Sequence, residues 1–151
     1  MDNKIYQTLI DAARKAVDRS YSPYSNFAVG AAVLAEDGSI VTAANVENAS
    51  YGLTICAERA AIFRYIAENH RRIRAIAVVS RAGGPCYPCG ACRQVISEFA
   101  NDKTEIVVEG STPGDVTVAR IADLLPHAFG PNDLKDIPAQ HIQQRQVAKR
   151  N

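Results

Sequence analysis

The chain has 151 residues, 47% of them apolar, which is enough for one domain with one hydrophobic core. Lys and Arg number 17 against 16 for Asp and Glu, so the net charge of +1 gives no long-range field that would favour a nucleic-acid polymer or an anionic membrane. No apolar run approaches the length of a membrane span, and the polar start of the chain lacks the apolar core of a signal peptide. We therefore expect a cytoplasmic protein, and its charge is compatible with a small neutral ligand.

The first half of the chain predicts two helices separated by a pair of strands. Apolar residues recur at helical spacing over residues 5–18, and the turn-forming sequence at 22–25 ends this run. The apolar runs 27–34 and 40–46 are joined by a short acidic-glycine turn, which is typical of a strand hairpin. Helical periodicity then returns over residues 54–69.

The second half of the chain alternates strands and helices. Residues 73–80 are an apolar run typical of a buried strand, residues 89–99 have the apolar spacing of a helix, and residues 105–109 predict another strand. A short helix is expected over 121–125. The segment 139–151 is polar enough that we expect a flexible C-terminal tail.

The order of these elements predicts an α/β fold. Strand, helix, strand, helix, strand in the middle of the chain implies right-handed crossovers, and the initial hairpin adds an antiparallel strand. We expect a single domain over residues 1–138, built as a three-layer α/β/α sandwich with a mixed, mostly parallel sheet. In such sheets, ligands lie beyond the carboxyl ends of the strands, where the following helices begin.

Three cysteines and one glutamate fall at that edge of the predicted sheet. Cys56-Ala57-Glu58 lies at the start of one helix, and Pro88-Cys89-Gly90-Ala91-Cys92 lies at the start of the next. Three thiolate ligands leave one position of a tetrahedral zinc open for water, and a glutamate that is not a ligand can then move the proton of this water. We therefore expect one Zn²⁺ per subunit, held by Cys56, Cys89 and Cys92. Glu58 is the expected catalytic acid and base.

Cys86 allows a different zinc site. It extends the pattern to Cys86-x-x-Cys89-x-x-Cys92, so a closed four-cysteine site with Cys56 is arithmetically possible. Such a structural zinc would leave no place for water and no use for Glu58, and we prefer to read Cys86 as a free thiol in the loop before the helix. A zinc-ribbon-like binding module is a further alternative, but it needs two C-x-x-C knuckles on turns, whereas these cysteines stand at helix starts.

The charge of the expected zinc site needs compensation. Three thiolates on Zn²⁺ leave the site at about −1, which weakens its ability to acidify water. Arg59 lies three residues after Cys56, and Arg93 is adjacent to Cys92, so both could donate hydrogen bonds to the sulfurs. We expect both arginines to have this role.

The chain resembles the small cytidine deaminases that act on free nucleosides. The zinc motif is similar to that of the zinc deaminases, with cysteine in place of histidine as the first ligand. The resemblance extends over four blocks in the same order, residues 22–30, 45–59, 88–94 and 124–126, which read SPYSNFAVG, NVENASYGLTICAER, PCGACRQ and LLP. It implies the cytidine deaminase-like fold and a nucleoside substrate.

The resemblance also implies which residues bind this substrate. Asn45 and Glu47 would hold the sugar hydroxyls, Phe27 would pack on the pyrimidine, and the backbone at Ala57 would contact the base. By residue type alone, Asn45 and Glu47 are equally compatible with turn and surface contacts, and Phe27 with core packing.

A homotetramer with shared active sites is the assembly that the resemblance implies. In it, Tyr51 and Phe129 would complete the pocket of a neighbouring subunit. Both residues are also compatible with ordinary packing.

The expected function is zinc-dependent hydrolytic deamination of cytidine and 2′-deoxycytidine to uridine and 2′-deoxyuridine, with release of ammonia, in pyrimidine salvage. The nearest alternative is a related aminopyrimidine nucleoside deaminase of the blasticidin-S type, against which Asn45 and Glu47 argue because they match the ribose-binding pattern. A deaminase of polynucleotides is disfavoured because the chain lacks a basic stripe with interleaved aromatic residues.

Overall fold

A five-stranded sheet in the order β2-β1-β3-β4-β5 forms the centre of the molecule. The computed structural model describes residues 1–134. Its strands are β1 (Val29–Ala35), β2 (Ile40–Ala44), β3 (Ile73–Ser80), β4 (Glu105–Glu109) and β5 (Val116–Arg120). Its helices are α1 (Asn3–Val17), α2 (Ala57–Ala67), α3 (Gly90–Phe99) and α4 (Ile121–Leu124), with the 3₁₀ turns η1 (Tyr51–Leu53) and η2 (Pro131–Leu134). The end of the predicted domain, 135–138, and the predicted tail, 139–151, lie outside the described residues.

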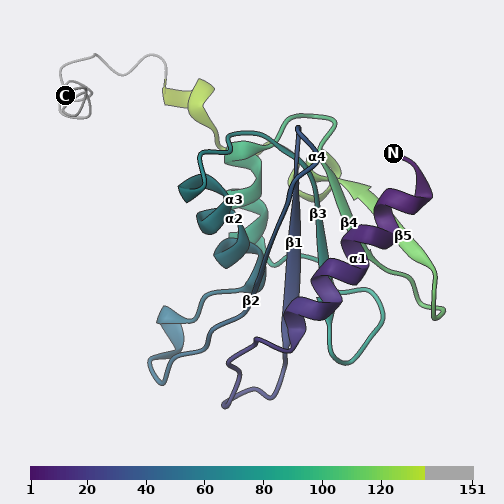
Figure 1. Cartoon of the computed structure of the whole chain (residues 1–151). Helices are drawn as coiled ribbons and strands as arrows, with labels where there is room; N and C mark the ends of the chain where they lie inside the picture. The colour runs from purple at the N-terminus through teal and green to yellow at the C-terminus, as the bar shows by residue number, and fades with distance from the viewer. Residues whose placement is uncertain (135–151) are drawn as a thin grey trace.

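Helices cover both faces of the sheet (Figure 1). α1 packs on one face through an apolar stripe that includes Leu9, Ala13 and Val17, all of them buried. α2 and α3 pack on the opposite face, where Ile62 and Ile96 are fully buried. The chain thus has the three layers that its sequence predicts. None of the helices in residues 1–134 combines the length and the hydropathy that a membrane span requires.

The sheet is mixed and mostly antiparallel, so the prediction of a mostly parallel sheet is wrong. Among the five strands of residues 1–134, only β3 and β4 pair in parallel, whereas β1 pairs antiparallel with both β2 and β3, and β5 pairs antiparallel with β4. The connections through α2 and α3 do join strands of one direction, since β2, β3 and β4 all run the same way. The prediction failed because β1 lies between β2 and β3, so the connection through α2 skips over a strand.

β5 is a strand that was not predicted from the sequence. This strand forms a hairpin with β4, and Gly114 takes a φ of +91° in the connecting loop. Val116 and Val118 alternate with polar residues after the turn-forming Pro113-Gly114, so the local signals for a strand are present in the sequence.

Gly30 shows why α1 docks closely on the central strand. All seven residues of β1 are buried. A Cβ atom at position 30 would lie 2.1 Å from the carbonyl oxygen of Ala13 in α1, so glycine is required by the close approach of helix and strand. This part of the sequence block 22–30 therefore has a packing role.

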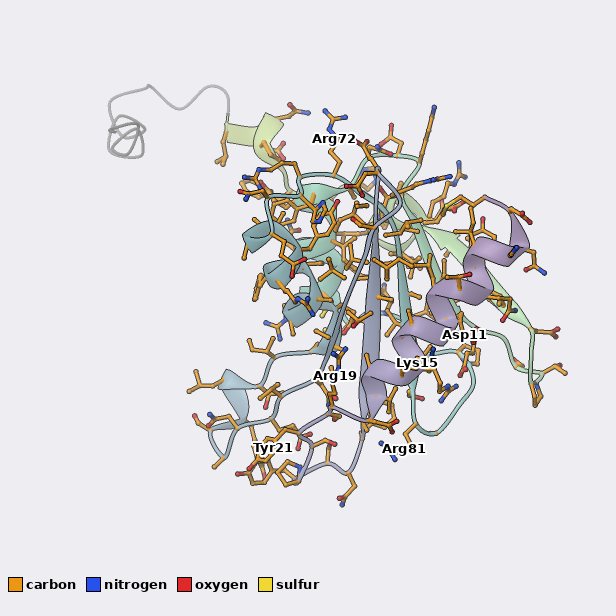
Figure 2. All side chains as sticks on the ribbon, in the orientation of Figure 1. Asp11, Lys15, Arg19, Tyr21, Arg72 and Arg81 are labelled. Carbon is orange, nitrogen blue, oxygen red and sulfur yellow. The ribbon has the colours of Figure 1, made fainter. Side chains whose placement is uncertain are left out.

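The strand directions create one edge where a site can form. The carboxyl ends of β2, β3 and β4 lie at the same edge of the sheet, and α2 and α3 begin there. In Figure 2, Tyr21 and Arg81 lie at this end of the molecule and Arg72 lies at the other. Loops at such an edge carry the ligand sites of α/β proteins.

Candidate active site

Cys56, Cys89 and Cys92 meet at this edge of the sheet. Cys56 is the N-cap residue of α2, Cys89 is the N-cap residue of α3, and Cys92 is buried in the first turn of α3. Their Sγ atoms all lie within 4.8 Å of one another, and those of Cys56 and Cys89 are 3.9 Å apart. Sulfurs bound tetrahedrally to one zinc at about 2.3 Å are about 3.8 Å apart, so this group fits a zinc ion.

The three sulfurs favour thiolate formation before any metal binds. A hydrogen bond from Cys92, together with the guanidinium of Arg59 and the thiol of Cys89, lowers the pKa of Cys56 to about 5. The same hydrogen bond raises the pKa of Cys92, which keeps the shared proton. At neutral pH the group therefore already contains one thiolate, the form that binds zinc.

Arg59 and Arg93 have different surroundings. Arg59 Nη2 lies 3.8 Å from the Cys56 sulfur and donates to the carbonyl oxygen of Thr54 at 3.1 Å. Arg93 instead donates to the backbone carbonyls of Pro88, at 2.8 Å, and Leu124, at 3.0 Å. The guanidinium of Arg59 thus lies beside a zinc-ligand sulfur, where it can compensate negative charge. The hydrogen bonds of Arg93 go to backbone carbonyls and not, as we had expected, to the sulfurs.

Glu58 is a buried carboxyl beside the cysteines. Its side chain follows Cys56 by two residues on α2, and the residue is only 4% exposed. Burial raises the pKa of this carboxyl, and the negative charge on Cys56 adds to the rise. A raised pKa suits a group that must both take up and release a proton near neutral pH.

Cys86 lies outside the sulfur group. Within residues 1–134, the group of neighbouring metal-ligand atoms has three members, and Cys86 is not one of them. Its side chain is partly buried against the core, and burial raises the pKa of its thiol. This geometry favours the open three-cysteine site over the closed four-cysteine one.

Asn45 is buried in a hydrogen-bond network at the same edge. Its Oδ1 accepts from the Val29 amide at 2.9 Å and from the Ser20 hydroxyl at 2.6 Å, and its Nδ2 donates to the Phe27 carbonyl at 2.9 Å. An asparagine side chain has two donor hydrogens and two acceptor lone pairs, so one N–H of Asn45 remains for a ligand. Ser20, which lies 25 residues from Asn45 in the chain, is a member of this network that was not predicted from the sequence.

Glu47 holds the loop that leads into β1. Its carboxylate accepts from the backbone amides of Tyr24 and Ser25, at 2.8 and 3.2 Å, and from the Ser25 hydroxyl. The hydrogen bond from this hydroxyl is the main reason that the pKa of Glu47 is lowered. Glu47 is therefore an ionised acceptor. Ser25, which donates to it, was not predicted from the sequence as a residue of the site.

The structure also places the other residues expected to bind substrate. Phe27 is 48% exposed, which rules out the core packing that its residue type suggests. Ala57, by contrast, is fully buried at the start of α2. Tyr51 is exposed, and its ring centroid lies 5.9 Å from that of Tyr24, in the loop held by Glu47. Phe129 is also exposed but belongs to the segment after α4, where its carbonyl accepts a hydrogen bond from Gln94.

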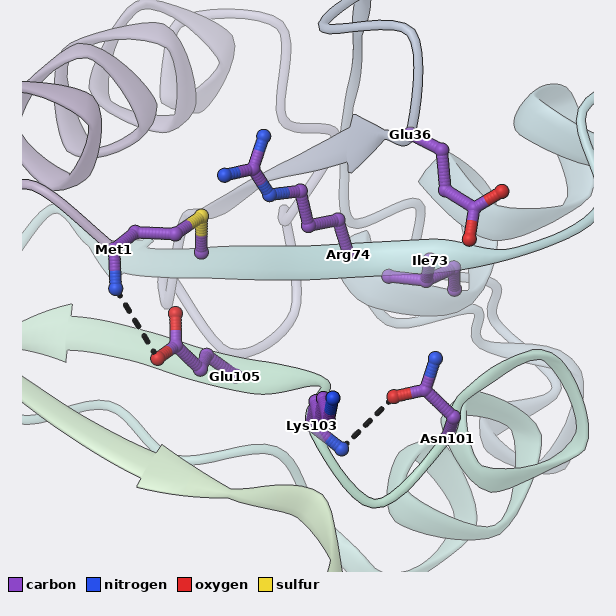
Figure 3. Close-up of a pocket in the computed structure, with 7 residues that line it drawn as sticks. All are labelled: Met1, Glu36, Ile73, Arg74, Asn101, Lys103 and Glu105. Atoms are coloured by element: carbon purple, nitrogen blue, oxygen red, sulfur yellow. Dashed lines mark hydrogen bonds and ion pairs between the residues drawn. The ribbon is translucent and has the colours of Figure 1, made fainter.

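A cavity at the opposite edge of the sheet shows that volume alone does not identify the site. Figure 3 shows this cavity of about 490 Å³, which lies beside the first residues of β3 and β4, at the edge opposite the cysteines. Of the described residues, those that line it include neither cysteine nor histidine. The sulfur group with its buried carboxyl has the chemistry of a hydrolytic site, and this cavity does not.

Comparison with known proteins agrees with the geometry. Residues 3–108 match the family model described as the cytidine and deoxycytidylate deaminase zinc-binding region. A cytidine deaminase of Halalkalibacterium halodurans is 48% identical over 130 residues, which cover 86% of this chain and 98% of the relative. A cytidine deaminase of Mycobacterium tuberculosis is 45% identical over 122 residues, covering 81% and 87%.

Solved structures give the same result. The crystal structure of cytidine deaminase from Burkholderia pseudomallei matches with a TM-score of 0.77 at 48% identity, covering 85% of this chain and all of that one. The cytidine deaminase from Bacillus anthracis has the same fold, with a TM-score of 0.68 at 18% identity over 83% of this chain and 89% of that one. By its sequence, its fold and its three-cysteine zinc site, the chain belongs to the cytidine deaminase family.

Proposed function

We propose that the protein catalyses the hydrolytic deamination of cytidine and 2′-deoxycytidine to uridine and 2′-deoxyuridine, with release of ammonia, in pyrimidine salvage. One observation carries this proposal: a group of three sulfurs that fits zinc lies beside the buried Glu58. The relatives that the chain resembles are cytidine deaminases. We further propose that residues 1–138 form one catalytic domain. The cytosolic location of the protein stays a prediction.

Glu58 performs the proton transfers of the proposed reaction. Cys56, Cys89 and Cys92 would hold the zinc ion, which would supply Lewis-acid activation of water. Glu58 would take a proton from this water and deliver it to N3 of the cytosine ring, and the hydroxide that remains would add to C4, which protonation at N3 has made more electrophilic. The same carboxyl would then take the proton of the added hydroxyl and deliver it to the amine, so the C4–N bond breaks and ammonia leaves as the carbonyl of uridine forms. Its raised pKa helps it to exchange a proton in both directions.

Asn45 and Glu47 are suited to bind one sugar hydroxyl together. Asn45 has an amide hydrogen left for a ligand, and Glu47 is an ionised acceptor. A hydroxyl can accept from the first and donate to the second. A hydroxyl common to ribose and deoxyribose would be held equally well, so the proposal includes both nucleosides. Phe27 would pack on the pyrimidine, and the backbone at Ala57 would contact the base.

We propose that the protein acts as a homotetramer with shared active sites. Several large apolar side chains are exposed on the loops around the site edge: Tyr21, Tyr24, Phe27, Val46, Tyr51 and Leu53. Such a group of exposed apolar residues is typical of an interface. Tyr51 and Phe129 would each complete the site of a neighbour.

Two variants can test whether sites are shared. Phe129→Ala keeps Glu58 but loses the donated ring, and Glu58→Gln keeps the ring but loses the proton shuttle. Co-expressed with different tags, the two variants should form hybrids more active than either variant alone, because a Phe129→Ala site would receive its ring from the partner subunit. Hybrids with no gain in activity would contradict the shared site.

Ammonia release distinguishes the proposed function from its alternatives. The purified protein should release ammonia from cytidine and deoxycytidine, and the rate should vary little with salt because no polyanion is bound. A cytosine-containing oligonucleotide should not be a substrate. Release from blasticidin S with none from either cytosine nucleoside would favour the alternative, a related aminopyrimidine nucleoside deaminase of the blasticidin-S type.

A further inference from the structure

The segment that carries Phe129 is weakly packed. After α4, residues 126–129 are exposed. A cavity of about 360 Å³ lies between this segment and the second half of α3, lined by Ser97 and Ala100 on one side and by Pro126 and Phe129 on the other. On this side the segment faces an open hollow and not packed side chains, so apolar packing contributes little to fixing its position.

Two consecutive side chains of α3 hold this segment and the end of α4 that precedes it. Arg93 donates to the carbonyl of Leu124 at 3.0 Å and, with its Nε, to the carbonyl of Pro88, the residue before Cys89. Gln94 Nε2 donates to the carbonyl of Phe129 at 2.8 Å. On the other side of Phe129, the Asp133 carboxylate accepts from the amide of Gly130 at 2.7 Å.

These contacts fix the backbone of Phe129 and leave its ring free. The residue is 60% exposed although its carbonyl is hydrogen-bonded. A side chain presented to another molecule needs this combination, because a fixed backbone reduces the entropy lost when the ring becomes ordered on binding. Arg93 and Gln94 directly follow the zinc ligand Cys92 on α3, so the end of α4 and the segment after it are tied to the helix whose start carries two of the three sulfurs.

We propose that Gln94 is a positioning residue for substrate binding, which orients the Phe129 ring toward the site of a neighbouring subunit. Arg93 supports it by joining the end of α4, just before this segment, to the loop before Cys89. The proposal rests on the proposed function, in which Phe129 completes a neighbour's site. It gives a role to a residue of the motif block 88–94 that neither zinc binding nor proton transfer uses.

Gln94 offers a clean test because it is exposed and its side-chain hydrogen bond goes to Phe129. Gln94→Glu keeps the size of the side chain but replaces the donor by acceptor oxygens, which cannot bond to a carbonyl. Gln94→Lys keeps a donor within reach of the same carbonyl and is the matched control. Arg93 is less suitable, since its loss would also release the loop before Cys89.

Steady-state kinetics with cytidine should separate positioning from a purely structural role. Gln94→Glu should raise KM by about 2- to 10-fold, the range expected for one lost hydrogen bond, with little change in kcat. Gln94→Lys should stay near wild type. Since both changes act through one ring, Gln94→Glu should add little to the defect of Phe129→Ala. Melting temperature and zinc content, measured alongside, should be unchanged.

The results that would contradict the role of Gln94 differ from the result that would contradict the proposed function. If Phe129→Ala raises KM but Gln94→Glu lowers only the melting temperature, or if the two defects add, Gln94 does not position the ring and the proposal is overturned. If Phe129→Ala has no effect on KM, the proposal is also overturned. In both cases turnover of cytidine by the wild-type protein leaves the proposed function standing, whereas a wild type that releases no ammonia from cytidine refutes that function itself.

Discussion

Replacing Glu58 by Gln should remove most of the turnover while the fold and the zinc site remain. Gln has the same shape as Glu, and the residue is only 4% exposed, so the change creates neither a cavity nor an overpacked core. What it removes is a proton acceptor. A positioned general acid and base contributes about 10²- to 10⁴-fold to rate, so kcat should fall by at least about 100-fold.

The same variant should not be less stable. Because burial raises the pKa of Glu58, the folded protein disfavours the ionised form relative to the unfolded chain. This carboxyl therefore opposes folding above its folded pKa, and the effect disappears as the pH falls and the group takes up a proton. A neutral Gln avoids the cost at neutral pH, so the melting temperature of Glu58→Gln should equal or exceed that of the wild type.

The assay combines turnover, metal content and thermal stability. Glu98→Gln is the matched control, because Glu98 is an exposed residue on the neighbouring helix α3 and should tolerate the same chemical change. Glu58→Gln should retain one zinc per chain with turnover nearly lost, and Glu98→Gln should behave as wild type. A Glu58→Gln protein with near-native turnover would refute the proton shuttle, and loss of zinc in this variant would show that Glu58 has a structural role.

Three further changes test the zinc centre. Arg59→Gln removes the guanidinium that lies 3.8 Å from the Cys56 sulfur, so zinc affinity or turnover should fall by about 10- to 100-fold, as for other residues that support metal ligands; full zinc occupancy with unchanged kinetics would contradict its charge-compensating role. Cys86→Ser should keep one zinc per chain and near-native activity because Cys86 lies outside the sulfur group, and loss of zinc would instead indicate the closed site. Zinc affinity, measured by competition with a chromophoric chelator, should fall with the pH because protons compete for the thiolates. The fall should steepen below about pH 5, where Cys56 also takes up a proton, and an affinity independent of pH would contradict this reading.

Local patterns in the sequence were sufficient to predict the α-helices and the ligands of the zinc centre. Cys56 and Cys89 were expected at helix starts because each is followed by a run with helical spacing, and they are the N-cap residues of α2 and α3. The order of the strands in the sheet could not be predicted from such local patterns. The residues of β1 alone do not show whether this strand lies at the edge of the sheet or between β2 and β3. Its position depends on pairing between residues far apart in the chain, such as Ala31 and Val78.

The surroundings of the polar site residues depend on distant partners too. Arg93 was expected to bond to sulfur because of its position beside Cys92, but its guanidinium reaches the carbonyl of Leu124, 31 residues away. Asn45 was identified through the family resemblance alone. Its network with Ser20 and Val29 appears only once the loop before β1 and the end of β2 are placed side by side.

The absorbance of cytidine is the most direct measurement of the central claim, that an open three-cysteine zinc site with Glu58 performs the deamination. On mixing with the zinc-loaded protein, the absorbance of cytidine should fall as uridine forms. The fall should stop when a chelator has removed the metal and resume when zinc is restored, because the fold should largely survive metal loss in a domain with its own core. No change with any cytosine nucleoside, or a rate unaffected by removal of the metal, would contradict the account.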